Sequence, residues 1–161
     1  MTVRTTHPVD PKFIHGDPFG VIGPNRRTPH RGIDYAVKSG TKLVSIGDGK
    51  IVATYWSDII GWVVEIEVDV MIRGKKAKRV FSYCHLLEDY SDKFKVGDPV
   101  TCGQIIVKSG NSGTRTTGAH LHLMAGRKPR LSINPVEDPL PLINASLVKV
   151  EPTPTPRRTG K

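Results

Sequence analysis

The chain has 161 residues, of which 37% are hydrophobic and 24% are charged. This length and composition fit one folded domain with a real core, and they exclude two large domains. Lysine and arginine together number 24 against 15 aspartates and glutamates, so the net charge is +9 with the histidines neutral. We therefore expect an anionic partner or surface, attracted over long range.

The N-terminal segment, residues 1–29, mixes proline, glycine and charged residues and follows neither a helical nor a strand period. It is predicted to be an irregular lead-in packed on the domain that follows. Its first residues, MTVRTTHPVDPKFIHGD, lack the apolar stretch of a secretory signal. No apolar run approaches the roughly 20 residues that span a bilayer. Neither a signal peptide nor membrane insertion is expected.

Short β-branched runs separated by glycine turns fill residues 33–125, and no convincing amphipathic helix interrupts them. This pattern predicts an all-β domain of antiparallel sheets with little helix. The expected strands read KLVSI, GKIVATYW, GWVVEIEVDVMI, RVFSYCHLL and QIIVKSG. The domain is placed at residues 30–146, and the Pro/Thr-rich basic end, residues 147–161, is predicted to be a tail or linker.

The clearest strand covers residues 63–71, where valine and isoleucine alternate with acidic residues. Its apolar face is expected to be buried and its acidic face to be in water. The acidic residues are Glu65, Glu67 and Asp69. In the RGKKAKR sequence that follows, a glycine lies within positive charge, which predicts a hairpin tip near Gly74 with its lysines in a solvated loop.

Several signals exclude other classes of protein. Cys84 and Cys102 are expected to be buried small apolar residues, because neither belongs to a CxxC pair. No GxGxxG or Walker motif indicates a nucleotide cofactor. Aromatic residues make up only 6% of the chain and do not alternate with the basic ones, so nucleic acid is not the expected anionic partner.

Two short segments carry the candidate metal ligands. His120 and His122 flank a leucine, so on an extended strand both imidazoles project from one face. His30 and Asp34 lie in PHRGIDYAV. If that segment is extended, His30, Gly32 and Asp34 share a face, and the missing side chain of Gly32 leaves space for an ion.

One imidazole and one carboxylate from the first segment, with one imidazole from the HLH pair, give the three ligands of a catalytic zinc site with an open fourth position. Zinc lowers the pKa of a water to about 7 and polarises a carbonyl. No HExxH helix provides a glutamate base, so the remaining histidines are the candidates for proton transfer. These are His85 and whichever of His120 and His122 is not a ligand, a choice that the residues alone leave open.

The chain resembles the lysostaphin or LytM-like zinc endopeptidases of bacterial cell walls. The matching motifs occur in the family's order between Phe19 and Leu123. They read FG, PHRGIDY, GTKLVSIGDGKIVATY, SYCHL and KVGDPVTCGQIIVKSGNSGTRTTGAHLHL. The departures are Ala119 for a frequent proline, Leu123 for a frequent phenylalanine, and a basic, rather long hairpin around Gly74. None of them removes a ligand or catalytic position.

The resemblance implies a compact, β-sandwich-like zinc peptidase domain and one Zn²⁺ per chain, held by His30, Asp34 and His122. It also implies that His85 and His120 act in proton transfer and oxyanion stabilisation. The expected activity is hydrolysis of peptide bonds in the stem peptide or cross-bridge of bacterial peptidoglycan, leading to lysis of the wall. Anionic polymers of the wall are expected as further partners of a domain with net positive charge.

The small size, the Pro/Thr tail and the N-terminal sequence are typical of a phage endolysin or virion-associated lysin. Such a protein would be made in the host cytoplasm or carried on the virion, and would act on the cell wall. The alternatives are a non-catalytic scaffold that activates an amidase, a wall-binding or zinc-stabilised interaction module, and a zinc amidase that cuts between sugar and peptide. The scaffolds typically lack zinc ligands, whereas this chain keeps all three.

Overall fold

The computed structural model describes residues 3–23, 28–116 and 118–143, and its strands pair antiparallel throughout these ranges. A seven-stranded sheet has the order β1-β2-β9-β6-β5-β4-β7, and β3 and β8 form a second sheet. The strands are β1 Ile14–His15, β2 Ile33–Tyr35, β3 Lys42–Val44, β4 Gly49–Ser57, β5 Gly61–Ile72, β6 Lys75–Leu86, β7 Pro99–Val100, β8 Ile105–Lys108 and β9 Leu121–Gly126. The predicted all-β fold with little helix is confirmed.

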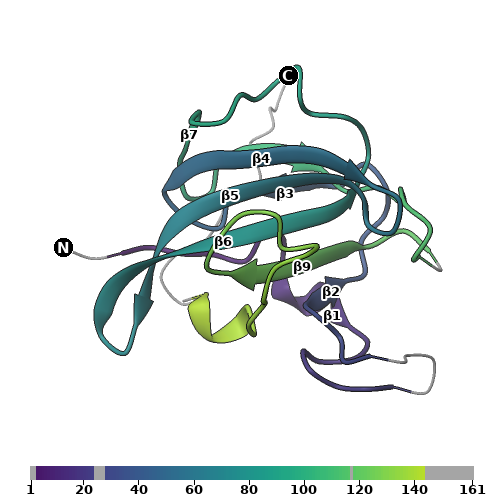
Figure 1. Ribbon diagram of the computed structural model, residues 1–161, viewed down its shortest axis with the longest axis horizontal. Helices are drawn as coiled ribbons and strands as arrows, with labels where there is room; N and C mark the ends of the chain where they lie inside the picture. The colour runs from purple at the N-terminus through teal and green to yellow at the C-terminus, as the bar shows by residue number, and fades with distance from the viewer. Residues whose placement is uncertain (1–2, 24–27, 117, 144–161) are drawn as a thin grey trace, which may run out of the picture.

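The two helical segments of the described ranges are short 3₁₀ turns, η1 (Pro11–Phe13) and η2 (Leu140–Leu142). Figure 1 shows β4, β5, β6 and β9 side by side, with β3 behind them and β1 and β2 along one edge. The end of the long β5–β6 hairpin projects from the sheet at the left of the view. None of the helical turns in these ranges is long and apolar enough to cross a membrane.

The main core lies between the large sheet and the β3–β8 sheet. The alternating apolar residues of β5 point into it, as predicted, and pack with residues of both sheets. Tyr83 of β6 joins the two sheets, because its hydroxyl donates to Val44 O (2.7 Å) and accepts from Ile46 N (3.1 Å) across the core. These bonds satisfy a polar group that is fully buried.

The opposite face of the large sheet is only partly open to water, which corrects the prediction for the acidic face of β5. Glu65 is fully buried there, because the chain after β9 folds back over it. The Glu65 carboxylate accepts hydrogen bonds from Tyr55 Oη, Arg130 N and Leu131 N. Three donors offset the cost of burying the charge. Strand periodicity could not show this, because the covering segment is remote in sequence.

The tip of the β5–β6 hairpin is where it was predicted. Arg73 and Gly74 have φ values of 51° and 77°, as in a two-residue turn of the I′ type. The lysines do not form a loop, however: Lys75, Lys76 and Lys78 belong to β6 and pair with β5. Lys76 and Lys78 both form ion pairs with Asp69 (3.5 and 2.9 Å), so cross-strand charge pairing extends the ladder to the turn.

Cys84 and Cys102 are both buried and both free, which confirms their predicted role as small apolar residues. Within residues 1–29, the structure places β1 beside β2 at the edge of the sheet. The predicted tail, residues 147–161, lies outside the described residues.

Candidate metal centre

β2 brings Asp34 to the face of the large sheet that points away from the main core. Its neighbours Ile33 and Tyr35 are buried in that core, so strand alternation sends the Asp34 side chain the other way. His30 lies just before the strand and is 2% exposed. The two side chains meet there, with 3.3 Å between His30 Nε2 and Asp34 Oδ2.

β9 presents His122 to the same point. Leu121 and Leu123 are buried in the main core, which leaves His122 on the opposite face, as alternation predicts. Asp34 pairs with His122 in the β2–β9 register, and His122 Nδ1 lies 2.9 Å from Asp34 Oδ1. One possible ligand atom from each of His30, Asp34 and His122 lies within 4.8 Å of the others. The structure thus brings together three predicted ligands from two separate segments.

Gly32 serves this centre differently from the way the sequence suggested. A Cβ at Gly32 would lie 2.1 Å from Leu123 O and 3.0 Å from His122 Cε1. The missing side chain therefore lets β9 approach the HRGID segment closely, rather than leaving room for an ion. This close approach sets the Asp34–His122 distance.

The donor set fits zinc. His30 Nδ1 lies 2.7 Å from Asp17 O, which can only accept, so Nδ1 carries the proton and Nε2 is the nitrogen turned towards Asp34. Burial raises the pKa of Asp34, but hydrogen bonds and charge from His122 and His30 outweigh it and hold the pKa well below its ordinary value. The carboxylate is therefore an ionised ligand. Two imidazoles and one carboxylate are a known three-ligand set for catalytic zinc.

His85 lies beside this group of three on β6. Its ring centroid is 6.2 Å from that of His122 and 4.7 Å from that of His120. Its Nδ1 lies 2.6 Å from Ser112 O, so Nδ1 is the donor and Nε2 has the lone pair. Burial lowers the pKa of His85 to about 4, although the bond to Ser112 acts in the opposite direction.

His120 lies next to His85 and just before β9. Its Nδ1 lies 2.8 Å from Gly118 O, which fixes the proton on Nδ1 as in His85. Its Nε2 is 3.9 Å from Asp34 Oδ1. His85 and His120 are thus close to the ligands without belonging to the group of three that the described residues form.

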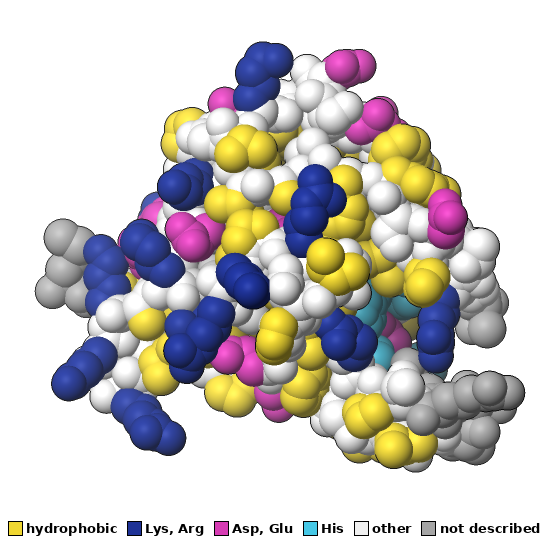
Figure 2. All heavy atoms as spheres, viewed as in Figure 1, with side chains coloured by type: hydrophobic (Ala, Val, Ile, Leu, Met, Phe, Trp, Pro, Cys, Tyr) yellow, Lys and Arg dark blue, Asp and Glu magenta, His cyan; other side chains and the backbone are white. Residues whose placement is uncertain are grey.

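A groove of about 210 Å³ opens onto Asp34 and His120. Figure 2 shows histidine side chains on the floor of a recess, with Lys or Arg on both sides. The residues that line the groove are His15, Gly16, Asp34, Ala36, Gly118, Ala119 and His120. His15, which the sequence gave no reason to group with the other four histidines, reaches this groove because β1 pairs with β2 opposite Asp34.

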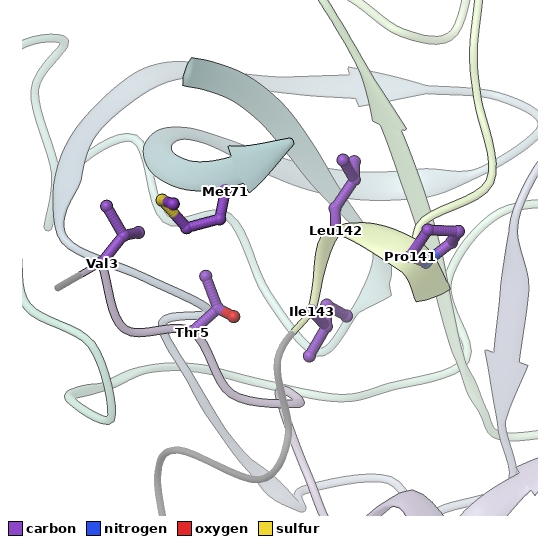
Figure 3. A pocket seen from close by; sticks show the side chains of 6 residues that line it. All are labelled: Val3, Thr5, Met71, Pro141, Leu142 and Ile143. Carbon is purple, nitrogen blue, oxygen red and sulfur yellow. The ribbon is translucent and has the colours of Figure 1, made fainter. Parts of the chain in front are cut away.

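A second cavity, of about 220 Å³, has no such chemistry (Figure 3). Its lining side chains are those of Val3, Thr5, Met71, Pro141, Leu142 and Ile143. No titratable side chain is among them. The two cavities are similar in volume, and only the groove beside the metal ligands is lined by histidines.

Sequence reasoning missed the groups that hold the imidazoles in place. Residues 17–21 hold His30 by three contacts: Asp17 O to His30 Nδ1 (2.7 Å), Gly20 N to His30 O (2.8 Å) and His30 N to Val21 O (3.0 Å). All three use backbone atoms of the predicted lead-in. Backbone acceptors leave no mark on residue type, so no pattern of residues could have found them.

Comparisons with known proteins agree with this geometry. The model of Peptidase family M23 matches residues 28–135. The glycyl-glycine endopeptidase ALE-1 of Staphylococcus capitis is 35% identical over 131 residues, which cover 80% of this chain but 32% of ALE-1. The chain thus spans about a third of that relative's length.

Two solved structures are similar in fold and in sequence. The catalytic domain of lysostaphin from Staphylococcus simulans has a TM-score of 0.61 and 31% identity, with 78% of this chain and 88% of that domain covered. A zinc containing peptidase from Vibrio cholerae has a TM-score of 0.61 and 29% identity, with 77% and 36% covered.

The β-sheet, with two imidazoles and a carboxylate converging on its face, is similar to the catalytic domain of lysostaphin, and its class is that of the M23 zinc metallopeptidase domains. The chain belongs to peptidase family M23. Zinc is accordingly the metal expected for this family, and His30, Asp34 and His122 are the described residues that could hold it.

Proposed function

We propose that this protein is an endopeptidase that hydrolyses a peptide bond in the stem peptide or cross-bridge of bacterial peptidoglycan. The observation that carries the proposal is the meeting of three possible metal ligands with two further histidines, beside a groove that Asp34 and His120 line. The similarity to ALE-1, a glycyl-glycine endopeptidase, supports a peptide substrate.

Each residue of the centre has a distinct task in this proposal. His30, Asp34 and His122 would hold the metal. His122 would bind it through Nδ1 only after losing any proton that Nδ1 shares with Asp34. Zinc supplies a Lewis acid that polarises the scissile carbonyl and acidifies water. His85 and His120 each direct Nε2 away from an acceptor-only carbonyl. In the neutral ring this nitrogen accepts a proton, and in the protonated ring it donates one to an oxyanion or leaving amine.

The groove fits an extended peptide better than a bulky ligand. Four of its lining residues are Gly16, Ala36, Gly118 and Ala119, whose side chains are absent or a single methyl. Such walls let a substrate backbone come close to the metal ligands. A site that must position a carbonyl within about 3 Å of reacting groups gains from this close approach.

The decisive experiment is digestion of purified cell walls of several cross-link types, followed by mass spectrometry of the fragments. New peptide amino termini are expected, and they should be absent with the Asp34→Ala variant or after chelation of zinc. New lactyl ends on the sugars would show an amidase instead. Zinc binding without cleavage of any wall would support a scaffold or binding module.

We further propose that anionic wall polymers concentrate the protein at the wall, supported by its net charge of +9. Added salt should then slow the digestion of intact walls more than the cleavage of a small neutral peptide. Equal sensitivity of both reactions would contradict this targeting role. That the protein is a phage endolysin or virion-associated lysin stays a prediction, to be tested by the lysis of intact cells and by its presence in purified virions.

A further inference from the structure

We infer that Ser112 is a positioning residue for His85: its hydroxyl fixes a loop whose carbonyl sets the tautomer and direction of the imidazole. The inference rests on the proposed function only in giving His85 a part in the reaction. The geometry that supports it lies in the contact between the loop before β9 and the β4–β5 turn.

The Ser112 hydroxyl stands between two strands. Oγ donates to Leu86 O at 2.6 Å and accepts from Trp62 N at 3.1 Å. Trp62 and Leu86 are partners in the β5–β6 ladder, next to a register shift between Trp62 and Val64. The hydroxyl therefore bonds to one backbone group of each strand where the regular pairing of β5 and β6 is interrupted. There the two strands leave backbone polar atoms that another group must satisfy.

Two glycines allow this insertion. A Cβ at Gly61 would lie 2.2 Å from Ser112 Oγ, and a Cβ at Gly113 would lie 2.5 Å from Gly61 N. Both residues also have a positive φ, 70° and 94°. The GNSG segment, residues 110–113, thus packs its backbone closely against the end of the β4–β5 turn, in addition to leading towards β9.

The same contact holds His85 in a strained conformation. His85 has φ 59°, which is uncommon for a residue other than glycine and persists only where the surroundings impose it. Its N donates to Ile60 O at 2.7 Å, and its Nδ1 donates to Ser112 O at 2.6 Å. The backbone and the ring of His85 are therefore tied to the two segments that the Ser112 hydroxyl joins.

The loop and the turn are joined at further points. Thr114 N donates to Asp58 O at 2.8 Å and Arg115 N to Ile59 O at 3.0 Å. Loss of the Ser112 hydroxyl should therefore shift the loop without detaching it. A shift of the Ser112 carbonyl would free Nδ1, so that the ring could turn or exchange its tautomer and Nε2 would lose its fixed direction beside His120 and His122.

Ser109 offers a matched control. It is a buried serine in the same connection, and its Oγ also bridges two backbone groups, donating to Lys38 O (2.8 Å) and accepting from Thr41 N (3.2 Å). These two hydrogen bonds of its side chain go to residues 38 and 41 and not to His85. Ser109→Ala should lower stability, because it removes both hydrogen bonds of this hydroxyl, although Thr41 N keeps its bond to Lys38 O, and it should leave kcat unchanged.

The kinetic test is a double-mutant cycle on the zinc-loaded enzyme. Ser112→Ala should lower kcat by a factor on the order of 10 to 10² with little change in KM, as expected for a misplaced catalytic group. In a His85→Ala background the same substitution should cost almost nothing, because the group it positions is gone. An equal loss in both backgrounds would overturn the inference and leave Ser112 a structural residue.

The second test does not depend on activity. In protein with ¹⁵N-labelled histidines, the His85 ring should give the signature of a single tautomer protonated at Nδ1. This signature should be lost or mixed in Ser112→Ala and kept in Ser109→Ala. A His85 tautomer unchanged in Ser112→Ala would overturn the inference. Wild-type protein that shows the single-tautomer signature of His85 but cleaves no wall would instead contradict the proposed function.

Discussion

The two halves of this centre are built in different ways. In the metal half, Asp34 and His122 face each other on two paired strands, and His30 lies just before the first of them, held by backbone atoms of residues 17–21. The flanking half, His85 and His120, depends on carbonyls of the connection before β9, from Ser112 and Gly118. Strand pairing thus sets two of the three metal ligands, whereas the rings of both flanking histidines depend on a connection between strands.

This difference has a functional logic. Metal ligands must keep their mutual distances within a few tenths of an ångström, which paired strands provide. Groups that transfer protons need a defined tautomer and direction, which backbone carbonyls of the connection before β9 provide here. We expect substitutions in the metal half to abolish zinc binding, and those in the flanking half to slow the reaction with zinc in place.

The largest effect is expected from Asp34→Ala. It removes the ionised ligand that lies near both His30 Nε2 and His122 Nδ1, so zinc and activity should be lost together. Metal analysis of the purified variant, alongside the rate of wall digestion, measures both. Asp92→Ala, at an exposed position away from the centre, is the matched control and should behave as wild type. Stoichiometric zinc in Asp34→Ala would contradict the assignment of Asp34 as a metal ligand.

His85→Ala and His120→Ala come next. Both variants should fold and keep about one zinc per chain, because neither residue belongs to the group of three ligands. Each should lose roughly 10²–10⁴ in rate, the range for a deleted general acid or base. Steady-state kinetics and metal content measured on the same sample test this contrast. Loss of zinc in His120→Ala and its retention in His122→Ala would exchange the two roles.

Gly32→Ala tests how the metal half is assembled. The added methyl would press on Leu123 O and the His122 ring, so we expect zinc affinity to fall and the free energy of unfolding to drop by about 1–3 kcal/mol. Calorimetry and zinc titration measure the two effects. Gly118→Ala, where a Cβ meets nothing within 4 Å, is the control for both. If the two variants are equally stable and bind zinc equally, the close approach of β9 does not set the ligand distances.

The smallest effect is expected from Arg31→Ala. Arg31 lies between His30 and Gly32, yet its side chain points to the segment after β9 and donates to Leu131 O and Asn134 O, both at 2.7 Å. Its loss should cost about 1–3 kcal/mol of stability. Zinc affinity should change by no more than about threefold, because no ligand depends on this side chain. A large loss of zinc affinity in this variant would show that zinc binding also depends on Arg31, which is not one of the three ligands.

The residues of this centre were predictable to the extent that they act through their side chains. The HxxxD and HxH spacings identified His30, Asp34 and the HLH pair because alternation on a strand fixes the direction of a side chain. Alternation could not show which of His120 and His122 lies opposite Asp34, because that depends on the register of β9 against β2.

The remaining features depend on contacts between segments remote in sequence. Glu65 looked solvent-facing because only its own strand was visible, and the segment that buries it follows β9. The charge of the lysines near Gly74 suggested a loop, whereas pairing with β5 continues up to the turn. His15 joins the groove through a two-residue strand, too short to give a period.

The central claim is that His30, Asp34 and His122 alone hold the metal. Anomalous diffraction at the zinc edge, from crystals of the zinc-loaded protein, tests it most directly because it locates the ion without reference to activity. We predict one peak per chain, within bonding distance of a nitrogen of His30, an oxygen of Asp34 and a nitrogen of His122, at about 2.0–2.2 Å. A peak bonded to His85 or His120, or no ordered peak at these three residues, would contradict the account.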